Sequence, residues 1–90
     1  MEHLTVESSM IRSIGYDQKS STLEVLFHNK TKKDGTVVPG ALWQYFFVPR
    51  DVYDSFLHAE SPGRFFGMSI KAVYQGRKVE EAREEKKEAD

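Results

Sequence analysis

The run Ser61-Pro62-Gly63-Arg64 has the residue types and the order that could hold a phosphate group or another anion. Serine followed by proline is a common helix start, and the amides in the first turn of a helix have no partner within that helix. Those amides, the Ser61 hydroxyl and the Arg64 guanidinium could converge on one anion, with Gly63 letting it approach the backbone closely. The alternative is a plain cap, the commoner use of such residues. In that case Arg64 pairs with a nearby carboxylate, from Asp51, Asp54 or Glu60.

Other positive side chains could add contacts to a nucleic-acid backbone. Lys30, Lys32 and Lys33 cluster near the tip of an expected hairpin, where they could steer phosphates. Lysines at an exposed tip also keep strand edges soluble, which is their commoner use. The residues predicted to contact nucleic acid are Arg64, Lys71, Arg12, Lys30, Lys32 and Lys33.

Trp43 and Tyr45 invite comparison with the sheet aromatics that stack on nucleobases. Their expected register places them on the same face as Leu23, Val25 and Phe27, which the helices must cover. Packing in the core is therefore favoured over base stacking.

Several classes of chemistry are excluded or unsupported. The chain has no cysteine, which removes disulfide frameworks, thiolate metal sites and cysteine nucleophiles. His3, His28 and His58 lack metal-ligand spacing, and no serine, histidine and acid form a catalytic arrangement in the sequence. We expect a protein that is not an enzyme and that needs neither a cofactor nor a metal ion.

Charge and hydropathy define the broad class. The 90 residues carry a net charge of -1, and the two signs nearly balance both in residues 1–76 and in 77–90. A nucleic-acid interface would therefore have to be a local basic patch. The longest near-apolar run is about eight residues, against roughly 20 for a membrane span, and the first residues do not resemble a signal peptide. The expectation is a cytoplasmic protein.

Three strands and two helices must position these side chains. Strands are predicted at residues 9–16, 22–27 and about 41–48, from β-branched and aromatic residues between turn signals. Gly15 marks a bulge or a close approach within the first strand. One helix begins at Pro49 and ends near His58, and a second begins after Ser61. The second helix is expected to bury Phe65, Phe66, Ile70 and Val73.

The register of the hairpin between residues 27 and 41 depends on its tip. Asp34-Gly35 is predicted to form a two-residue loop. Without a bulge, Val25 would face Gln44 and mix polar with apolar side chains. An extra residue absorbed at Pro39-Gly40 gives one continuous apolar face, so we favour this bulged register. It pairs Phe27 with Trp43, Val25 with Tyr45 and Leu23 with Phe47.

These elements predict an α+β domain in the order β-β-β-α-α. Its three-stranded antiparallel sheet is covered on one face by two short helices. Residues 1–8 form a flexible lead-in, residues 9–76 the domain, and residues 77–90 a charged, solvated tail.

A further set of residues forms ordered motifs: Ser8-Ser9, Ile11, Ile14 to Asp17, Trp43-Gln44-Tyr45, Val48-Pro49, Val52-Tyr53, Ser61, Gly63 to Phe66, Ile70 and Tyr74. This set, within residues 8–79, resembles the KTSC domain, a family named for a C-terminal appendage of some lysyl-tRNA synthetases that also occurs as small bacterial proteins. The resemblance implies an α+β fold and suggests RNA binding, by association with tRNA synthetases. This chain has a longer loop from His28 to Gly40 and an extra charged tail after Val79.

The function predicted from these observations is a small, non-catalytic binding module. It would bind RNA or another single-stranded nucleic acid weakly through a local basic patch. The alternative is a protein-interaction module that uses an exposed sheet edge or the long hairpin, as a monomer or a weak homodimer.

Overall fold

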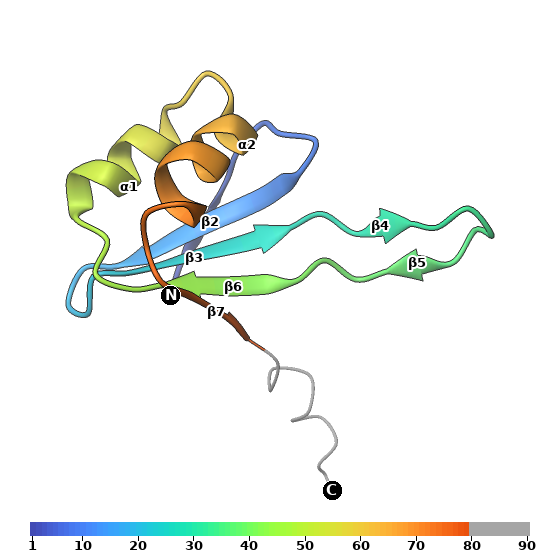
Figure 1. Cartoon of the computed structure of the whole chain (residues 1–90), viewed down its shortest axis with the longest axis horizontal. Coiled ribbons are helices and arrows are strands. Elements are labelled where there is room, and N and C mark those ends of the chain that lie inside the picture. Colours follow the sequence, from blue (N-terminus) through green and yellow to red (C-terminus); the bar gives the residue numbers. More distant parts are fainter. Residues whose placement is uncertain (80–90) are drawn as a thin grey trace, which may run out of the picture.

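The protein is an α+β domain built on one antiparallel sheet, seen here in a computed structural model that describes residues 1–79. Five strands lie in the order β1-β2-β3-β6-β7, and each neighbouring pair is antiparallel (Figure 1). The bounds are β1 His3–Thr5, β2 Ile11–Asp17, β3 Thr22–Phe27, β6 Leu42–Tyr45 and β7 Gly76–Val79. A separate two-stranded ribbon, β4 Lys30–Thr31 and β5 Val37–Val38, extends β3 and β6 away from the domain (Figure 1). We call residues 29–39 the arm.

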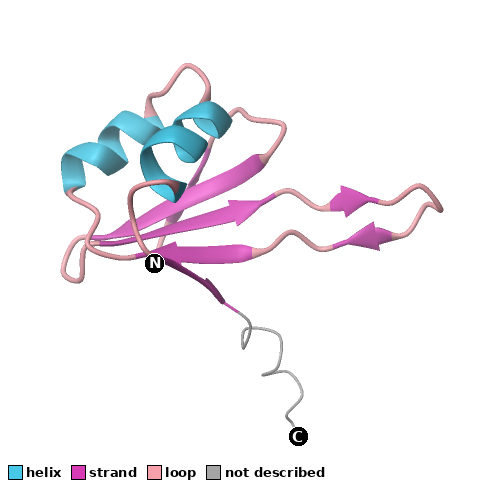
Figure 2. Ribbon diagram, in the orientation of Figure 1, coloured by secondary structure: helices cyan, strands magenta, loops and turns pink. Residues whose placement is uncertain are grey.

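Both helices cover the same face of the sheet (Figure 2). Helix α2 spans Pro62–Phe65 after Ser61, with Pro62 at the first helical position as predicted. Helix α1 spans Arg50–Leu57 and begins one residue later than predicted, because Pro49 is its N-cap with an extended ψ of 153°. Helix α2 continues without a break into a wider π-helical segment, η1, Phe66–Lys71. The α+β class, the antiparallel sheet and the two helices are therefore confirmed.

The core lies between the sheet and the helical layer. Phe56 of α1 and Ile70 of η1 are fully buried against it. The Tyr16 and Tyr53 rings stack at 4.9 Å between centroids, joining β2 to α1. The other buried apolar residues are Val6, Ile11, Ile14, Leu23, Val25, Tyr45, Val48 and Phe66.

The prediction of three strands was wrong because two short edge strands were missed. β1 lies within the expected lead-in of residues 1–8, and three residues are too few to show an alternating pattern. β7 lies where the second helix was expected to give way to the charged tail. Its middle residues, Arg77 and Lys78, are exposed charges of the kind that protect sheet edges. The rest of the expected tail, residues 80–90, lies outside the described residues.

The predicted hairpin register was also wrong. The tip is a three-residue loop, Lys33 to Gly35, closed by a 2.8 Å bond from the Lys32 amide to the Thr36 carbonyl, and Gly35 takes the left-handed φ of 91°. Leu23 therefore pairs with Tyr45 and Val25 with Trp43, two positions away from the favoured pairing.

An error of two residues preserves the face of every side chain in a strand. Trp43 and Tyr45 consequently lie on the helix-covered face, as predicted, although for a different register.

The end of the helical layer also differs from the prediction. Val73, expected in the buried stripe, is 62% exposed, because the wider η1 segment ends at Lys71 and the chain then turns toward β7. Within residues 1–79, no helix has the length and apolar character needed to cross a bilayer.

Candidate functional site

A groove of about 770 Å³ lies where the helical layer, the edge of the sheet and the base of the arm meet. Its walls come from the start of β2, the arm base, β6, the α2–η1 segment and β7. This volume falls in the range of about 300–1,000 Å³ that is usual for ligand pockets. The lining residues are Ser9, Met10, Phe27 to Lys30, Val38 to Ala41, Trp43, Tyr45, Gly63, Phe66, Gly67, Lys71, Tyr74, Gly76 and Lys78.

Aromatic rings form one side of the groove. Trp43 and Tyr45 stack along β6 with centroids 6.1 Å apart, and Tyr45 meets Phe66 edge-on at 5.6 Å. Phe27 contacts the same Phe66 ring edge-on at 5.4 Å. Tyr45 is only 4% exposed, and its burial raises the pKa of its hydroxyl. Trp43 is half-buried, because it lies farther toward the arm.

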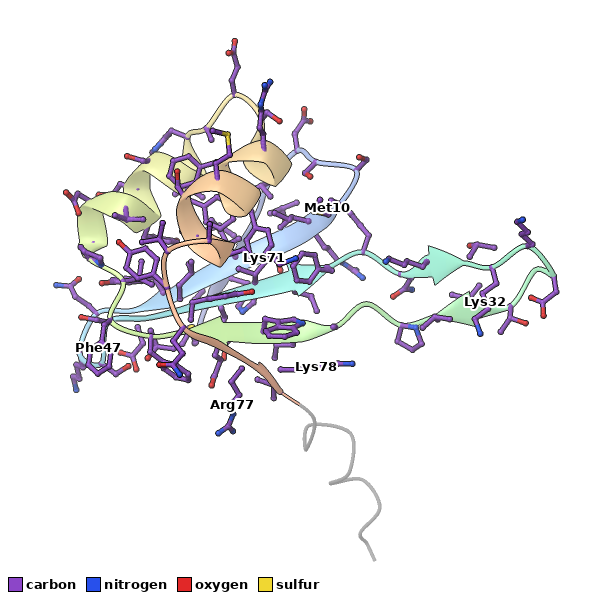
Figure 3. The ribbon with its side chains drawn as sticks, in the orientation of Figure 1. Met10, Lys32, Phe47, Lys71, Arg77 and Lys78 are labelled. Carbon is purple, nitrogen blue, oxygen red and sulfur yellow. The ribbon has the colours of Figure 1, made fainter. Side chains whose placement is uncertain are left out.

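The charged residues of the groove within residues 1–79 have one sign. Lys30, Lys71 and Lys78 line it and are exposed, and in this described part of the chain no aspartate or glutamate lines it. Lys71 comes from the helical layer and Lys78 from β7 (Figure 3). His28 also lines the groove, where its Nε2 is 3.0 Å from the Ser8 carbonyl oxygen. The chain as a whole has a net charge of -1, whereas the charged side chains that the described residues contribute to the groove are lysines.

The structure brings together only part of the predicted nucleic-acid site. Lys30 and Lys71 line the groove. Lys32 lies toward the tip of the arm (Figure 3), and Lys33 follows it in the exposed tip loop. Arg12 is exposed at a bulge of β2 and is not among the lining residues. Lys78 was missed, since it pairs with Trp43 across the unpredicted strand β7. It was assigned to the charged tail of residues 77–90, and no local pattern marked it as a strand residue.

The three residues of the predicted anion site face two different surfaces. Gly63 lines the groove, where Met10 and Ser8 are its side-chain neighbours. Ser61 and Arg64 instead line a shallower depression of about 430 Å³, together with Glu60.

The alternative, a plain cap, is confirmed in position only, since Ser61 is the N-cap residue of α2 and Pro62 is its first helical residue. The Ser61 hydroxyl makes no capping bond, and α2 is a single turn. Asp54, one of the expected partners of Arg64, pairs with Arg50 at 3.3 Å. Among residues 1–79, no ion pair involves Arg64.

A polar network crosses the open face of the sheet, and sequence reasoning did not find it. His3 Nδ1 lies 2.8 Å from Ser13 Oγ, and His3 Nε2 lies 2.7 Å from Glu24 Oε1. The other Glu24 oxygen accepts a 2.9 Å bond from the Gln44 amide. A serine–histidine–carboxylate chain resembles a hydrolase triad. However, Ser13 is 8% exposed, and none of these residues lines the groove or the depression. We therefore interpret the network as structural.

Gly15 makes this network possible. It lies directly between His3 on β1 and Glu24 on β3 in the strand pairing. A Cβ at Gly15 would lie 2.7 Å from His3 Cδ2, so the imidazole can cross β2 only over a glycine. This confirms the close approach predicted at Gly15.

Comparison with known proteins gives a consistent family. The family model described as KTSC domain matches residues 7–74. An uncharacterized protein of Stutzerimonas stutzeri is 37% identical over 71 residues, which cover 79% of this chain and 86% of that protein. A protein of Tsukamurella paurometabola is 38% identical over 70 residues, covering 78% and 90% respectively.

A solved structure agrees with these sequence relatives. The crystal structure of a KTSC domain protein from Yersinia pestis superimposes with a TM-score of 0.69 at 36% identity, covering 87% of this chain and 96% of that one.

Proposed function

The chain belongs to the KTSC domain family, and on this premise we propose that it is a non-catalytic module that binds single-stranded nucleic acid, RNA above all, in its groove. The observation that carries the proposal is the charge of the groove. Three lysines from the arm, the helical layer and β7 line it, and none of its lining residues within 1–79 carries a carboxylate, although the whole chain is slightly acidic. Such a surface attracts phosphates and repels basic protein segments. We place this activity in the cytoplasm.

The groove favours a single strand over a duplex. Proteins that bind single strands combine a positive track for the backbone with aromatic rings for the bases. The groove has both, with Lys30, Lys71 and Lys78 beside Trp43. A duplex hides its bases and offers its phosphates on a convex surface that a groove of this size cannot enclose. With only three lysines, we expect dissociation constants that are micromolar or weaker.

An amide-shift NMR titration with a short single-stranded RNA tests this proposal. The shifts should localise to residues that line the groove, with Lys71, Trp43 and Lys78 among them, and should shrink as salt is raised. A hairpin duplex RNA of equal phosphate content is the control and should bind more weakly. Shifts confined to the tip of the arm, or no shifts at low salt, would refute binding in the groove.

A second candidate is a protein-interaction module. Phe47 favours it, because this aromatic side chain is 83% exposed and its backbone has the unfavourable φ of 58°. The sedimentation coefficient of the wild type and of Phe47→Ser, measured across concentrations, tests self-association. A concentration dependence that Phe47→Ser removes would support this candidate. Unchanged sedimentation in both proteins would leave Phe47 without a role in self-association.

A further inference from the structure

The aromatic stack on β6 ends at the groove. Tyr45 and Trp43 lie on one face of β6 and both carry rings. Ala41, just before β6, takes the next position on that face, because the Phe27 amide still donates a hydrogen bond to its carbonyl. Tyr45 covers one face of the indole, with the two ring planes 18° apart. At the next position the side chain is the methyl group of Ala41. The strand itself therefore supplies no ring for the other face of Trp43.

The space over Ala41 belongs to the groove. Ala41, Trp43, Phe27 and Gly40 all line it. Phe27 borders this space from β3, since its amide donates a 3.0 Å hydrogen bond to the Ala41 carbonyl. Within residues 1–79, Tyr45 is the one aromatic ring that stacks on Trp43. A flat ring placed over Ala41 would be the third member of the stack.

The residues around this space indicate which kind of ring could bind there. Offset stacking on tryptophan favours flat aromatic systems, and nucleobases bind proteins in this way. Lys78 pairs with Trp43 across β6 and β7, and Lys71 lines the same groove from η1. A ring that carries a phosphate would satisfy both features. A neutral apolar ring would gain no binding energy from the charges of Lys71 and Lys78.

We propose that the space over Ala41 is the binding position of one unpaired nucleobase, stacked on the outer face of Trp43, with its phosphate held by Lys71 and Lys78. This inference rests on the proposed binding of nucleic acid in the groove, and it adds that a base as well as the backbone is bound. A free nucleotide and a nucleotide within a strand present the same ring and phosphate, so the experiment uses both.

The single tryptophan of the chain is the reporter. Its fluorescence is followed during titration with adenosine 5′-monophosphate, with ribose 5-phosphate and with a five-residue oligoadenylate. An abasic ribose-phosphate oligomer of equal length is the fourth probe. The nucleotide and the oligoadenylate should quench Trp43, and the two probes without bases should not. Quenching by the nucleotide alone would assign the site to free nucleotides, and stronger binding of the oligomer would assign it to strands.

Two variants separate base binding from phosphate binding. Ala41→Leu fills the proposed position and should weaken oligoadenylate binding about 5- to 150-fold, the usual effect of losing a stacked base, while leaving binding of the abasic oligomer unchanged. Trp43→Leu should do the same, followed by NMR because the reporter is lost. The amide spectrum of each variant shows whether it is folded, and Ala41→Leu keeps the aromatic stack intact.

The two proposals fail in different ways. Equal affinity for the oligoadenylate and the abasic oligomer would refute the stacked base and leave phosphate binding in place. Binding of neither oligomer to the folded wild type would refute both.

Discussion

Lys71 and Arg64 lie on one continuous helical segment and face different surfaces. Lys71 lines the groove beside Lys30 and Lys78, whereas Arg64 lines the shallow depression beside Glu60. Both side chains are exposed, so each phosphate contact is worth about 0.5–1 kcal/mol. Lys71→Gln should therefore weaken binding of a short single-stranded RNA about two- to fivefold. Arg64→Gln is the matched control and should have little effect, as measured by fluorescence anisotropy. The reverse order would move the binding site to the start of α2.

The network on the open face makes a second prediction at the scale of residues. His3→Ala removes two side-chain hydrogen bonds and should lower the free energy of unfolding by about 1–2 kcal/mol. Gly15→Ala should be at least as destabilising, because its Cβ would displace the His3 ring.

The double variant tests whether the two effects share this cause. Gly15→Ala should be less destabilising in the His3→Ala background, as measured by urea denaturation. A residual effect is expected from the Glu2 carbonyl oxygen, 2.9 Å from the added Cβ. Additive effects would show that His3 and Gly15 act independently.

The elements differ in how far the sequence predicts them. The strand at residues 22–27 and the helix after Pro49 were predicted because their apolar residues repeat over a full element and a turn or proline bounds each one. β1 and β7 were not predicted, since each is short and lies at an edge of the sheet. An edge strand is held mainly by hydrogen bonds to one neighbouring strand, so its side chains need not be buried. The hairpin register failed because a three-residue and a two-residue loop look alike around Asp34-Gly35.

The residues of the candidate site likewise divide into those that the sequence predicts and those that it does not. Lys30 and Lys71 were identified by charge alone, which local sequence displays. Lys78 lies beside Trp43 in the groove only because β7 pairs with β6. Arg64 lies outside the groove because α2 directs its side chain toward the shallow depression. Both facts depend on tertiary packing, which no local pattern contains.

We predict that the domain folds without the arm. Every residue of 29–39 is exposed, and the buried core residues all lie outside it. Replacing residues 30–38 by Asn-Gly, a favoured two-residue hairpin turn, should change the free energy of unfolding by less than about 1 kcal/mol. RNA affinity should fall only by the contribution of Lys30, about two- to fivefold. Thermal unfolding and anisotropy measure the two effects. Loss of folding would instead give the arm a structural role.

At the scale of the whole molecule, two buried tyrosines make stability depend on alkaline pH. Burial is the main cause that raises the pKa of Tyr45 and of Tyr53 above the ordinary value of 10.0, and for Tyr53 the Arg50 charge opposes it. The folded state therefore holds these protons more tightly than the unfolded state. The two protonated tyrosines contribute fully to the free energy of unfolding below pH 10. This contribution is lost as the pH rises through their pKa values in the folded state.

The predicted result is a free energy of unfolding that falls above pH 10. Tyr45→Phe should make this fall shallower, as measured by urea denaturation between pH 8 and 11. Phenylalanine keeps the contact with Phe66 and cannot ionise. An equally steep fall in the variant would exclude Tyr45 as a source of the alkaline sensitivity.

The salt dependence of RNA affinity should be set by the lysines of the groove and not by the net charge of the whole molecule. The net charge of -1 gives no general attraction for a polyanion, so the three lysines must supply the electrostatic free energy locally. Each phosphate neutralised on a single strand contributes about -0.7 to the slope of log affinity against log salt concentration, which predicts a slope of about -2. Lys71→Gln should reduce its magnitude by about 0.7, and Lys19→Gln, on the exposed turn after β2, should not change it. A slope near zero for the wild type would mean that the lysines do not contact phosphates, whatever the affinity.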